Sequence, residues 1–200
     1  MQAALDQFSE NLKRARILTG LAESLSQLTT EAIDLSDLYR ASLVLGVGAL
    51  DNFVHQFVRL GMVDIHRGKR PITDAYLSFK IPMNAARQAT ANIGHDDWLN
   101  ETIRAAHGWL SFQHPDKIAE AIRLMSAEKL WERVAAELVT TTTAVKAQLL
   151  AIVDRRNKIA HEADMDPTNP GYRWPIDKML VEDALDFLER LTKAIYKVAA

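Results

Sequence analysis

An arginine, an asparagine and a histidine occur at close spacing late in the chain, in the segment Arg156-Asn157-Lys158-Ile159-Ala160-His161. A guanidinium carries a fork of donors that matches phosphate oxygens, and an imidazole can exchange a proton near neutral pH. Asn157 and His161 share one face of a helix. The three could therefore bind a phosphate group and transfer a proton. The alternative is an exposed charge cluster near a helix C-terminus, where the dipole favours Arg and His.

The element that must position these residues is an amphipathic helix. From about Thr141 to Asp164, apolar residues recur at a helical spacing that should face a core. Arg156 lies on that apolar stripe, where a leucine would be expected. Asp51 lies on the mainly apolar face of an earlier predicted helix, and a buried carboxylate without a partner is costly. We therefore predict that Asp51 pairs with Arg156, within one chain or across a dimer.

The rest of the chain has helical periodicity and no strand pattern. Long helices are predicted over about 2–28, 37–60 and 177–198, and Gly61 is predicted to end the second. Gly46 and Gly48 in that helix suggest close approach of another helix. Residues 72–138 form a helical insertion, and 165–175, with three prolines, form a rigid strap. The sequence thus predicts one all-α domain over 1–200, a bundle of four long helices with an insertion before the motif helix.

Composition limits the function. Two hundred residues can bury a substantial core, and the formal net charge of −2 gives no global basic field to attract nucleic acid. The chain has no cysteine, which excludes disulfides and thiolate metal sites and is typical of a reducing cytosol. The most apolar run, 41–50, is shorter than the roughly 20 residues that span a bilayer. We expect a cytoplasmic protein with no membrane contact.

The motif also resembles a known family. Arg156-Asn157-x-x-x-His161 is similar to the Arg-x4-6-His signature of the HEPN superfamily, and the segments 154–162 and 41–51 resemble its RiboL-PSP branch. The resemblance implies a HEPN-like bundle, a homodimer with the motif helices at its interface, and RNA as substrate. It implies metal-independent cleavage by attack of the 2′-hydroxyl, leaving a 2′,3′-cyclic phosphate and a 5′-hydroxyl, with no cofactor. His161 would be general acid and base, Arg156 would stabilise the phosphate, Asn157 would orient it, and Asp51 would anchor Arg156.

The same resemblance implies a biological setting. Members of the family act in bacterial defence, as toxins or anti-phage effectors, so an antitoxin or another regulator is an expected partner. In toxins controlled by a partner nucleotidyltransferase, a tyrosine stands two residues after the histidine. Ala163 occupies that position here, so control by tyrosine modification at this site is not expected.

Two further segments could bind RNA. Arg67, Lys69 and Arg70 form a compact basic loop suited to phosphate contacts, although such a loop is often only a solvated surface. Arg173 and Trp174 lie in the strap and could stack on unpaired bases. The alternative is that the strap aromatics pack down on the bundle.

Two other functions compete with the ribonuclease. A HEPN-like bundle can act as a non-catalytic module for RNA binding or dimerisation. His95-Asp96 resembles the central pair of the all-helical HD-type phosphohydrolases, for which His66 and Asp154 are nominal further ligands. We expect no metal site, because the remaining histidines lack nearby carboxylates.

Overall fold

The computed structural model of the chain describes residues 1–30, 33–91 and 94–200. Within these ranges the chain forms only helices, apart from one isolated bridge between Met165 and Arg173. This confirms the predicted all-α class. The helices are α1 (Gln2–Ser26), α2 (Ser36–His66), α3 (Asp74–Leu77), α4 (Met83–Ala91), α5 (Asp97–His107), α6 (Pro115–Arg123), α7 (Leu130–Glu137), α8 (Thr142–His161) and α9 (Lys178–Ala199).

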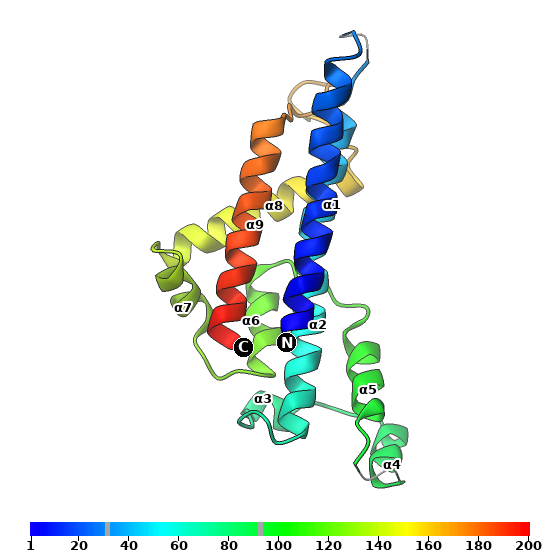
Figure 1. The fold of residues 1–200 in the computed structure, drawn as a ribbon, viewed down its shortest axis with the longest axis vertical. Helices are drawn as coiled ribbons and strands as arrows, with labels where there is room; N and C mark the ends of the chain where they lie inside the picture. The colour runs from blue at the N-terminus through cyan, green and yellow to red at the C-terminus, as the bar shows by residue number, and fades with distance from the viewer. Residues whose placement is uncertain (31–32, 92–93) are drawn as a thin grey trace.

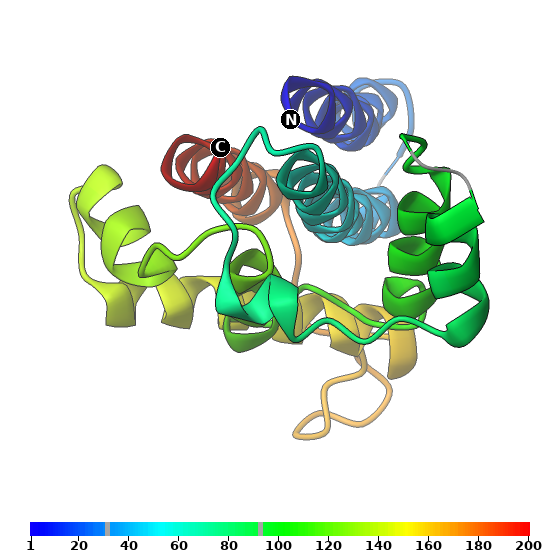
Figure 2. The same cartoon turned by 90° about the horizontal axis from the view of Figure 1, so that it is seen from below.

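Four long helices form the bundle, as predicted. Helices α1, α2 and α9 run side by side, and α8 crosses α2 on the side away from α1 (Figures 1 and 2). Their shared core is aromatic and aliphatic. Phe8 of α1 packs edge-on against Phe53 of α2, and Phe53 stacks on Phe57 with ring centroids 4.9 Å apart. Burial of each such side chain stabilises the folded state by about 1.5–3 kcal/mol. Helix α2 contacts α1, α8 and α9, so it is the centre of the bundle.

Helix α2 is longer than the sequence predicts. It continues through Gly61 to His66, so the predicted stop at Gly61 is wrong. The glycine serves close packing instead, because a Cβ at this position would lie 2.6–2.8 Å from atoms of Met125. Gly46 also permits close approach, since a Cβ there would clash with Leu185 of α9. Gly48 is exposed and has nothing within 4 Å of an added Cβ, so it has no such role within this chain.

The insertion is helical, as predicted, and contains α3 to α7 (Figure 1). Helices α4 and α5 pack together at one end of the molecule, where α5 also contacts α2. Helix α7 packs against α8 and α9. Thr141 caps the motif helix α8, because its hydroxyl accepts a 3.1 Å hydrogen bond from the N–H of Ala144. The helix ends at His161 and not near Asp164, so the motif forms its last turns.

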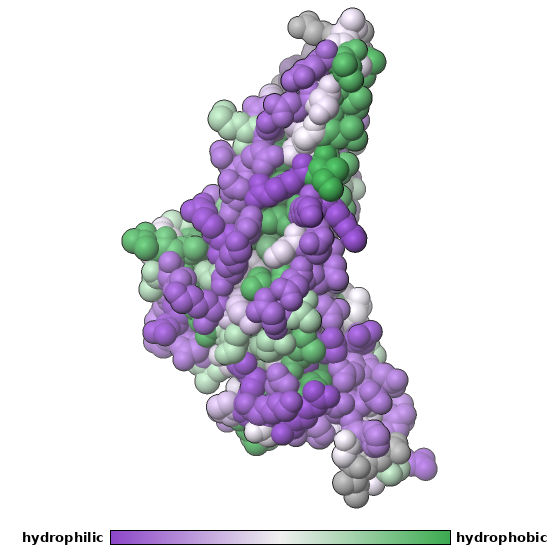
Figure 3. Space-filling view, in the orientation of Figure 1, coloured by the Kyte–Doolittle hydropathy of each residue, from purple (hydrophilic) through white to green (hydrophobic). Residues whose placement is uncertain are grey.

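Helix α2 is also long and apolar enough to cross a membrane, the single individual helix of the described residues with that property. However, 56% of its most apolar window is buried in the bundle, as expected for the core helix of a folded domain. The face shown in Figure 3 is largely hydrophilic, with hydrophobic patches between the charged side chains. Helix α1 contributes exposed apolar residues at Ile17 and Leu21. The apolar run 41–50 is therefore a core segment, as predicted.

Candidate functional site

The end of α8 is held by a buried cluster of charged side chains. The Asp164 side chain is fully buried, and its Oδ2 accepts hydrogen bonds from Nε of Arg40 at 2.7 Å and from a terminal nitrogen of Arg155 at 2.8 Å. Arg40 belongs to α2 and Arg155 to α8, whereas Asp164 follows α8 in the chain. One carboxylate therefore joins α2, the motif helix and the start of the strap.

The same two arginines bind the far end of the strap. The carbonyl oxygen of Trp174 accepts from Arg40 at 2.9 Å and from Arg155 at 3.1 Å, and the carbonyl oxygen of Pro175 accepts from Arg155 at 3.1 Å. The N–H of Trp174 donates to the Asp164 carbonyl at 2.9 Å. Burial lowers the pKa of Arg155 from its ordinary value, and the Asp164 carboxylate opposes that change. Both ends of the strap are thus fixed to the end of α8.

The turn that places Asp164 inside the molecule adopts a left-handed backbone. Ala163 has φ 51° and Asp164 has φ 59°, a conformation that costs a residue with a Cβ roughly 1–2 kcal/mol. The N–H of Asp164 donates to the carbonyl oxygen of Lys158 at 3.0 Å and so closes the C-terminus of the helix. The ion pairs of Asp164 offset this strain, because they require its carboxylate to turn back under α8.

Arg156, directly after Arg155, makes fewer hydrogen bonds. Its side chain is half-buried, and one terminal nitrogen donates to Oδ1 of Asn157 at 3.0 Å. Its Nε is buried without a hydrogen-bond partner, and no carboxylate of the described residues pairs with it. His161 is exposed in the last turn of α8. Asn157 and His161 are therefore exposed, and Arg156 has no carboxylate partner among the described residues, whereas one terminal nitrogen of Arg155 donates three hydrogen bonds within the fold.

Helix geometry separates the guanidinium from the imidazole. At about 100° per residue, His161 lies roughly 140° from Arg156 around the α8 axis but only about 40° from Asn157. The hydrogen bond from Arg156 to Asn157 draws the guanidinium away from the inner stripe and toward the face that carries His161. The structure thus brings Arg156 and Asn157 together through this hydrogen bond, and an orienting role of Asn157 stays a prediction.

Asp51 does not meet Arg156 within the chain. Its carboxylate accepts a 2.5 Å hydrogen bond from the backbone N–H of Phe112 and lies 4.0 Å from Nε2 of His55. Among the described residues, no ion pair joins Asp51 to Arg156. The partner of Asp51 is a backbone group 61 positions away, in the connection between α5 and α6. Pairing of Asp51 with Arg156 across a dimer stays a prediction.

Two of the three side chains of the predicted basic loop have partners within the chain. Arg67 pairs with Asp96 at 2.6 Å, and Arg70 donates to the carbonyl oxygen of Ala199 at 2.6 Å. Arg70 therefore ties the C-terminal end of α9 to the loop that follows α2. Lys69 is exposed. RNA contact through these residues stays a prediction.

Of the strap aromatics, Trp174 packs toward the bundle, whereas Tyr172 is exposed. Trp174 is half-buried, and the ammonium group of Lys158 lies 5.8 Å from the centroid of its ring. Arg173 pairs with Asp34 at 2.7 Å and also with Asp37 at the start of α2. These contacts agree with the packing alternative for the strap. Base stacking by Trp174 and RNA contact by Arg173 stay predictions.

The residues proposed for a phosphohydrolase have other partners. Asp96, at the N-cap position of α5, pairs with Arg67. Asp154 pairs with Lys158 one turn along α8 at 2.9 Å. In the part of the chain that the structure describes, no group of three or more histidines and carboxylates could hold a metal ion. The donor set that this alternative requires is therefore not assembled from these residues.

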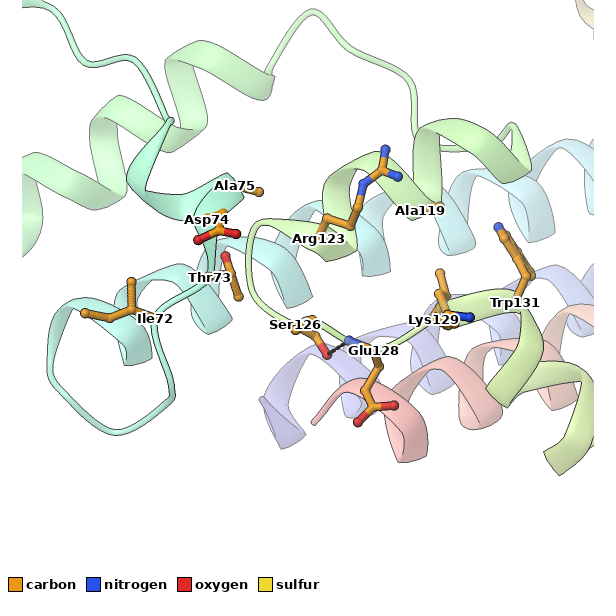
Figure 4. Close-up of a pocket in the computed structure, with 12 residues that line it drawn as sticks. Ile72, Thr73, Asp74, Ala75, Ala119, Arg123, Ser126, Glu128, Lys129 and Trp131 are labelled. Carbon is orange, nitrogen blue, oxygen red and sulfur yellow. Dashed lines mark hydrogen bonds between the residues drawn. The ribbon is translucent and has the colours of Figure 1, made fainter.

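A surface cavity of about 450 Å³ lies between α3 and the segment from α6 to α7 (Figure 4). Its charged lining is mixed, with Arg123 and Lys129 on one hand and Asp74 and Glu128 on the other. None of the predicted site residues lines it. This cavity is therefore separate from the candidate site at the end of α8.

The sequence alone did not identify the buried cluster of Arg40, Arg155 and Asp164. Arg155 was only a neighbour of the motif, and Arg40 lies 124 positions before Asp164. The sequence contains one indication of this cluster. Arg40 directly precedes the apolar run 41–50, and a buried arginine needs a hydrogen-bonding or charged partner. These three residues fix the position of the end of α8 through contacts within the chain.

Comparison with known families identifies one relationship. The family described as RiboL-PSP-HEPN matches residues 9–200 of this chain. No curated protein and no solved structure gives a match. The matched region contains α2, α8 and α9, most of α1, the insertion, the buried cluster and the motif at the end of α8.

Proposed function

The chain belongs to the RiboL-PSP-HEPN family, and from this membership and the open motif we propose that it is a metal-independent endoribonuclease. The observation that supports the proposal most strongly is the contrast at the end of α8. Arg156, Asn157 and His161 remain available in a segment that is otherwise fixed by buried ion pairs. Groups held at a rigid position but lacking partners are suited to bind a reacting phosphate.

The reaction uses the 2′-hydroxyl of the RNA as nucleophile. His161 removes the proton of that hydroxyl, and the 2′ oxygen forms a bond to the adjacent phosphorus. The bond from phosphorus to the 5′ oxygen of the next nucleotide breaks, and an imidazolium donates a proton to this leaving oxygen. The products are a 2′,3′-cyclic phosphate and a 5′-hydroxyl. Arg156 stabilises the extra negative charge on the phosphate oxygens as the new bond forms.

We propose that the working unit is a homodimer. One chain has a single His161, and the reaction needs both a base and an acid. Within one α8, the imidazole and the guanidinium leave the axis in directions roughly 140° apart. A two-fold arrangement of two α8 helices would supply two histidines and two arginines to one cleft. The outer face of α8 suits such packing, since Leu150 is 39% exposed and Ala147 and Ala151 beside it are small and exposed.

Dimerisation would also create a local positive surface that the monomer lacks. A monomer with formal net charge −2 attracts RNA poorly. Two motif ends placed together would concentrate Arg156, Lys158 and His161 from both chains at one surface. The family membership further suggests a role in bacterial defence or in a toxin–antitoxin pair, with an antitoxin as the regulatory partner.

The proposal is tested by incubating the protein with single-stranded RNA in the presence of EDTA. We expect cleavage that EDTA does not change, with a loss of about 10²–10⁴-fold for His161→Ala and of about 10²–10³-fold for Arg156→Ala. His95→Ala and Arg190→Ala change exposed residues outside the motif and serve as matched controls. The 2′,3′-cyclic end is identified by mass spectrometry.

Each other outcome has a defined meaning. RNA binding without cleavage would support the non-catalytic module. Cleavage that EDTA abolishes, or that survives His161→Ala, would contradict the proposed chemistry. Light scattering that gives the mass of a single chain for the active protein would refute the shared cleft.

A further inference from the structure

A second cluster of basic side chains lies far along the chain from the motif, between α2 and α5. It surrounds a cavity of about 310 Å³. Helix α2 contributes His55, Gln56 and Arg59 to its lining, and α5 contributes Arg104 and His107. No carboxylate lines the cavity, in contrast to the mixed charges of the cavity in Figure 4. This composition favours an anionic ligand.

Arg59 is a cation without a charged partner. Its Nε and one terminal nitrogen donate to the amide oxygen of Gln56, and its other terminal nitrogen donates to the amide oxygen of Asn100 at 2.5 Å. No ion pair of Arg59 with a carboxylate is formed within the described residues. Arg104 approaches closely enough that, after burial, its charge lowers the pKa of Arg59. Two guanidinia therefore repel one another across a space that an anion would fill.

His107 provides the independent second observation. Its side chain is more than nine-tenths buried, at 6% exposure, and lines the cavity. Its Nδ1 is buried without a hydrogen-bond partner. An unpaired polar atom in such a place costs about 1–3 kcal/mol. The ring is held edge-on by Phe79 and by Phe112, with centroids 5.8 Å and 5.4 Å away. This packing fixes the imidazole in the lining of the cavity, with one ring nitrogen that no group of the described residues satisfies.

His55 is a further basic residue in the lining of the cavity. Its ring packs on Phe112 with centroids 4.5 Å apart, so Phe112 lies between the two imidazoles. The Asp51 carboxylate lies 4.0 Å from Nε2 of His55 and is not part of the cavity lining. It is held by the backbone N–H of Phe112, so it orients His55 and Phe112 and leaves both arginines uncompensated.

We propose that this pocket between α2 and α5 binds a phosphate group through Arg59, Arg104 and His107. Guanidinium forks match phosphate oxygens, and charge-assisted hydrogen bonds to an anion are the stronger kind. A protonated or donor tautomer of His107 adds a further donor. The phosphate belongs either to an RNA strand or to a free phosphorylated small molecule. The proposal is independent of whether the end of α8 catalyses cleavage.

The test titrates the full-length protein with three probes and follows the ring signals of His107 by NMR. The probes are inorganic phosphate, adenosine 5′-monophosphate and a 2′-O-methyl RNA oligonucleotide, which has no free 2′-hydroxyl and cannot be cleaved. We expect the His107 signals to shift on binding and Arg104→Gln to weaken binding about tenfold. Arg104 is exposed, so the variant should fold, and Arg14→Gln removes the same charge from the exposed face of α1 as a control.

The three probes separate the sources of the phosphate. Weaker binding of the RNA oligonucleotide by Arg104→Gln, along with the nucleotide, assigns the pocket to the RNA strand. A loss confined to phosphate and the nucleotide assigns it to a free phosphorylated molecule. Unchanged His107 signals with every probe, or equal effects of Arg104→Gln and Arg14→Gln, overturn the proposal. Because the RNA probe is uncleavable, a failure of the nuclease proposal leaves these results unaffected.

Discussion

Two neighbouring arginines in α8 show opposite uses of the same side chain. Arg155 donates to the Asp164 carboxylate and to two strap carbonyl oxygens, and Arg40 binds the same carboxylate from α2. Arg156 binds only the amide of Asn157. A charge paired with a buried carboxylate stabilises one arrangement of the chain. A charge without an opposite partner at a rigid position is available for a ligand.

This difference separates structural charges from functional ones across the molecule. The buried cluster of Arg40, Arg155 and Asp164 accounts for how the strap and the end of α8 are fixed. The α2–α5 pocket resembles the motif, because Arg59 has no carboxylate partner among the described residues and Nδ1 of His107 has no hydrogen-bond partner. Three experiments test whether this contrast holds.

The largest effect is expected for Asp164→Asn. Asparagine tolerates the left-handed backbone of this position, so the variant removes the charge and keeps the turn. It removes the carboxylate that Arg40 and Arg155 share and leaves Arg40 only the longer contact with Asp37 at 3.6 Å, which should lower the free energy of unfolding by about 3–5 kcal/mol. Urea denaturation measures the change. The control Asp154→Asn breaks an exposed pair with Lys158 on the same helix and should cost less than about 1 kcal/mol. Equal losses in the two variants would show that the buried cluster is not a structural centre.

A matched pair of lysine substitutions sharpens the contrast between the adjacent arginines. Arg155→Lys removes the terminal nitrogen that donates to three acceptors and should lower the free energy of unfolding by about 1–3 kcal/mol. Arg156→Lys should change stability by less than about 0.5 kcal/mol, as for surface changes away from structural contacts. RNA cleavage, measured well below the unfolding temperature, should fall more in Arg156→Lys than in Arg155→Lys. The reverse order in either assay would remove the distinction.

The fold was largely predictable because helical periodicity is a local property. Apolar residues at helical spacing predicted the four long helices, including the motif helix, and Thr141 caps α8 close to the predicted start of that helix. The end of α2 was not predictable from Gly61, because the reason for that glycine is its contact with Met125, which is distant in sequence. A glycine needed for close packing and a glycine that ends a helix look the same in sequence.

The site was predictable only in part, because some of its contacts join residues that are distant in sequence. Arg156, Asn157 and His161 form a local pattern, so their spacing was visible. The partners of Asp51 and Asp164 come from segments 61 and 124 positions away, and no spacing rule joins them. The prediction for Asp51 correctly identified a carboxylate that needs a partner. It could not identify the partner as a backbone N–H, because every residue except proline offers one.

The smallest effect is expected from the pH dependence of His107. Burial, and then the nearby His55, lower the pKa of His107 from its ordinary value. The unfolded chain therefore binds a proton at this position at a higher pH than the folded protein does. The stability contributed by this neutral, buried ring is fully present above pH of about 6.5 and is lost as pH falls through the lower folded pKa. We expect urea midpoints to decrease from pH 7.5 to pH 5.5, and His107→Gln to reduce that decrease, whereas His95→Gln, which changes an exposed ring, should retain the wild-type decrease. Bound phosphate should oppose the loss in the wild-type protein, because an anion in the pocket favours the protonated imidazole. An identical decrease with and without His107 would mean that this ring is not the titrating group, and it would weaken the parallel between the α2–α5 pocket and the open motif.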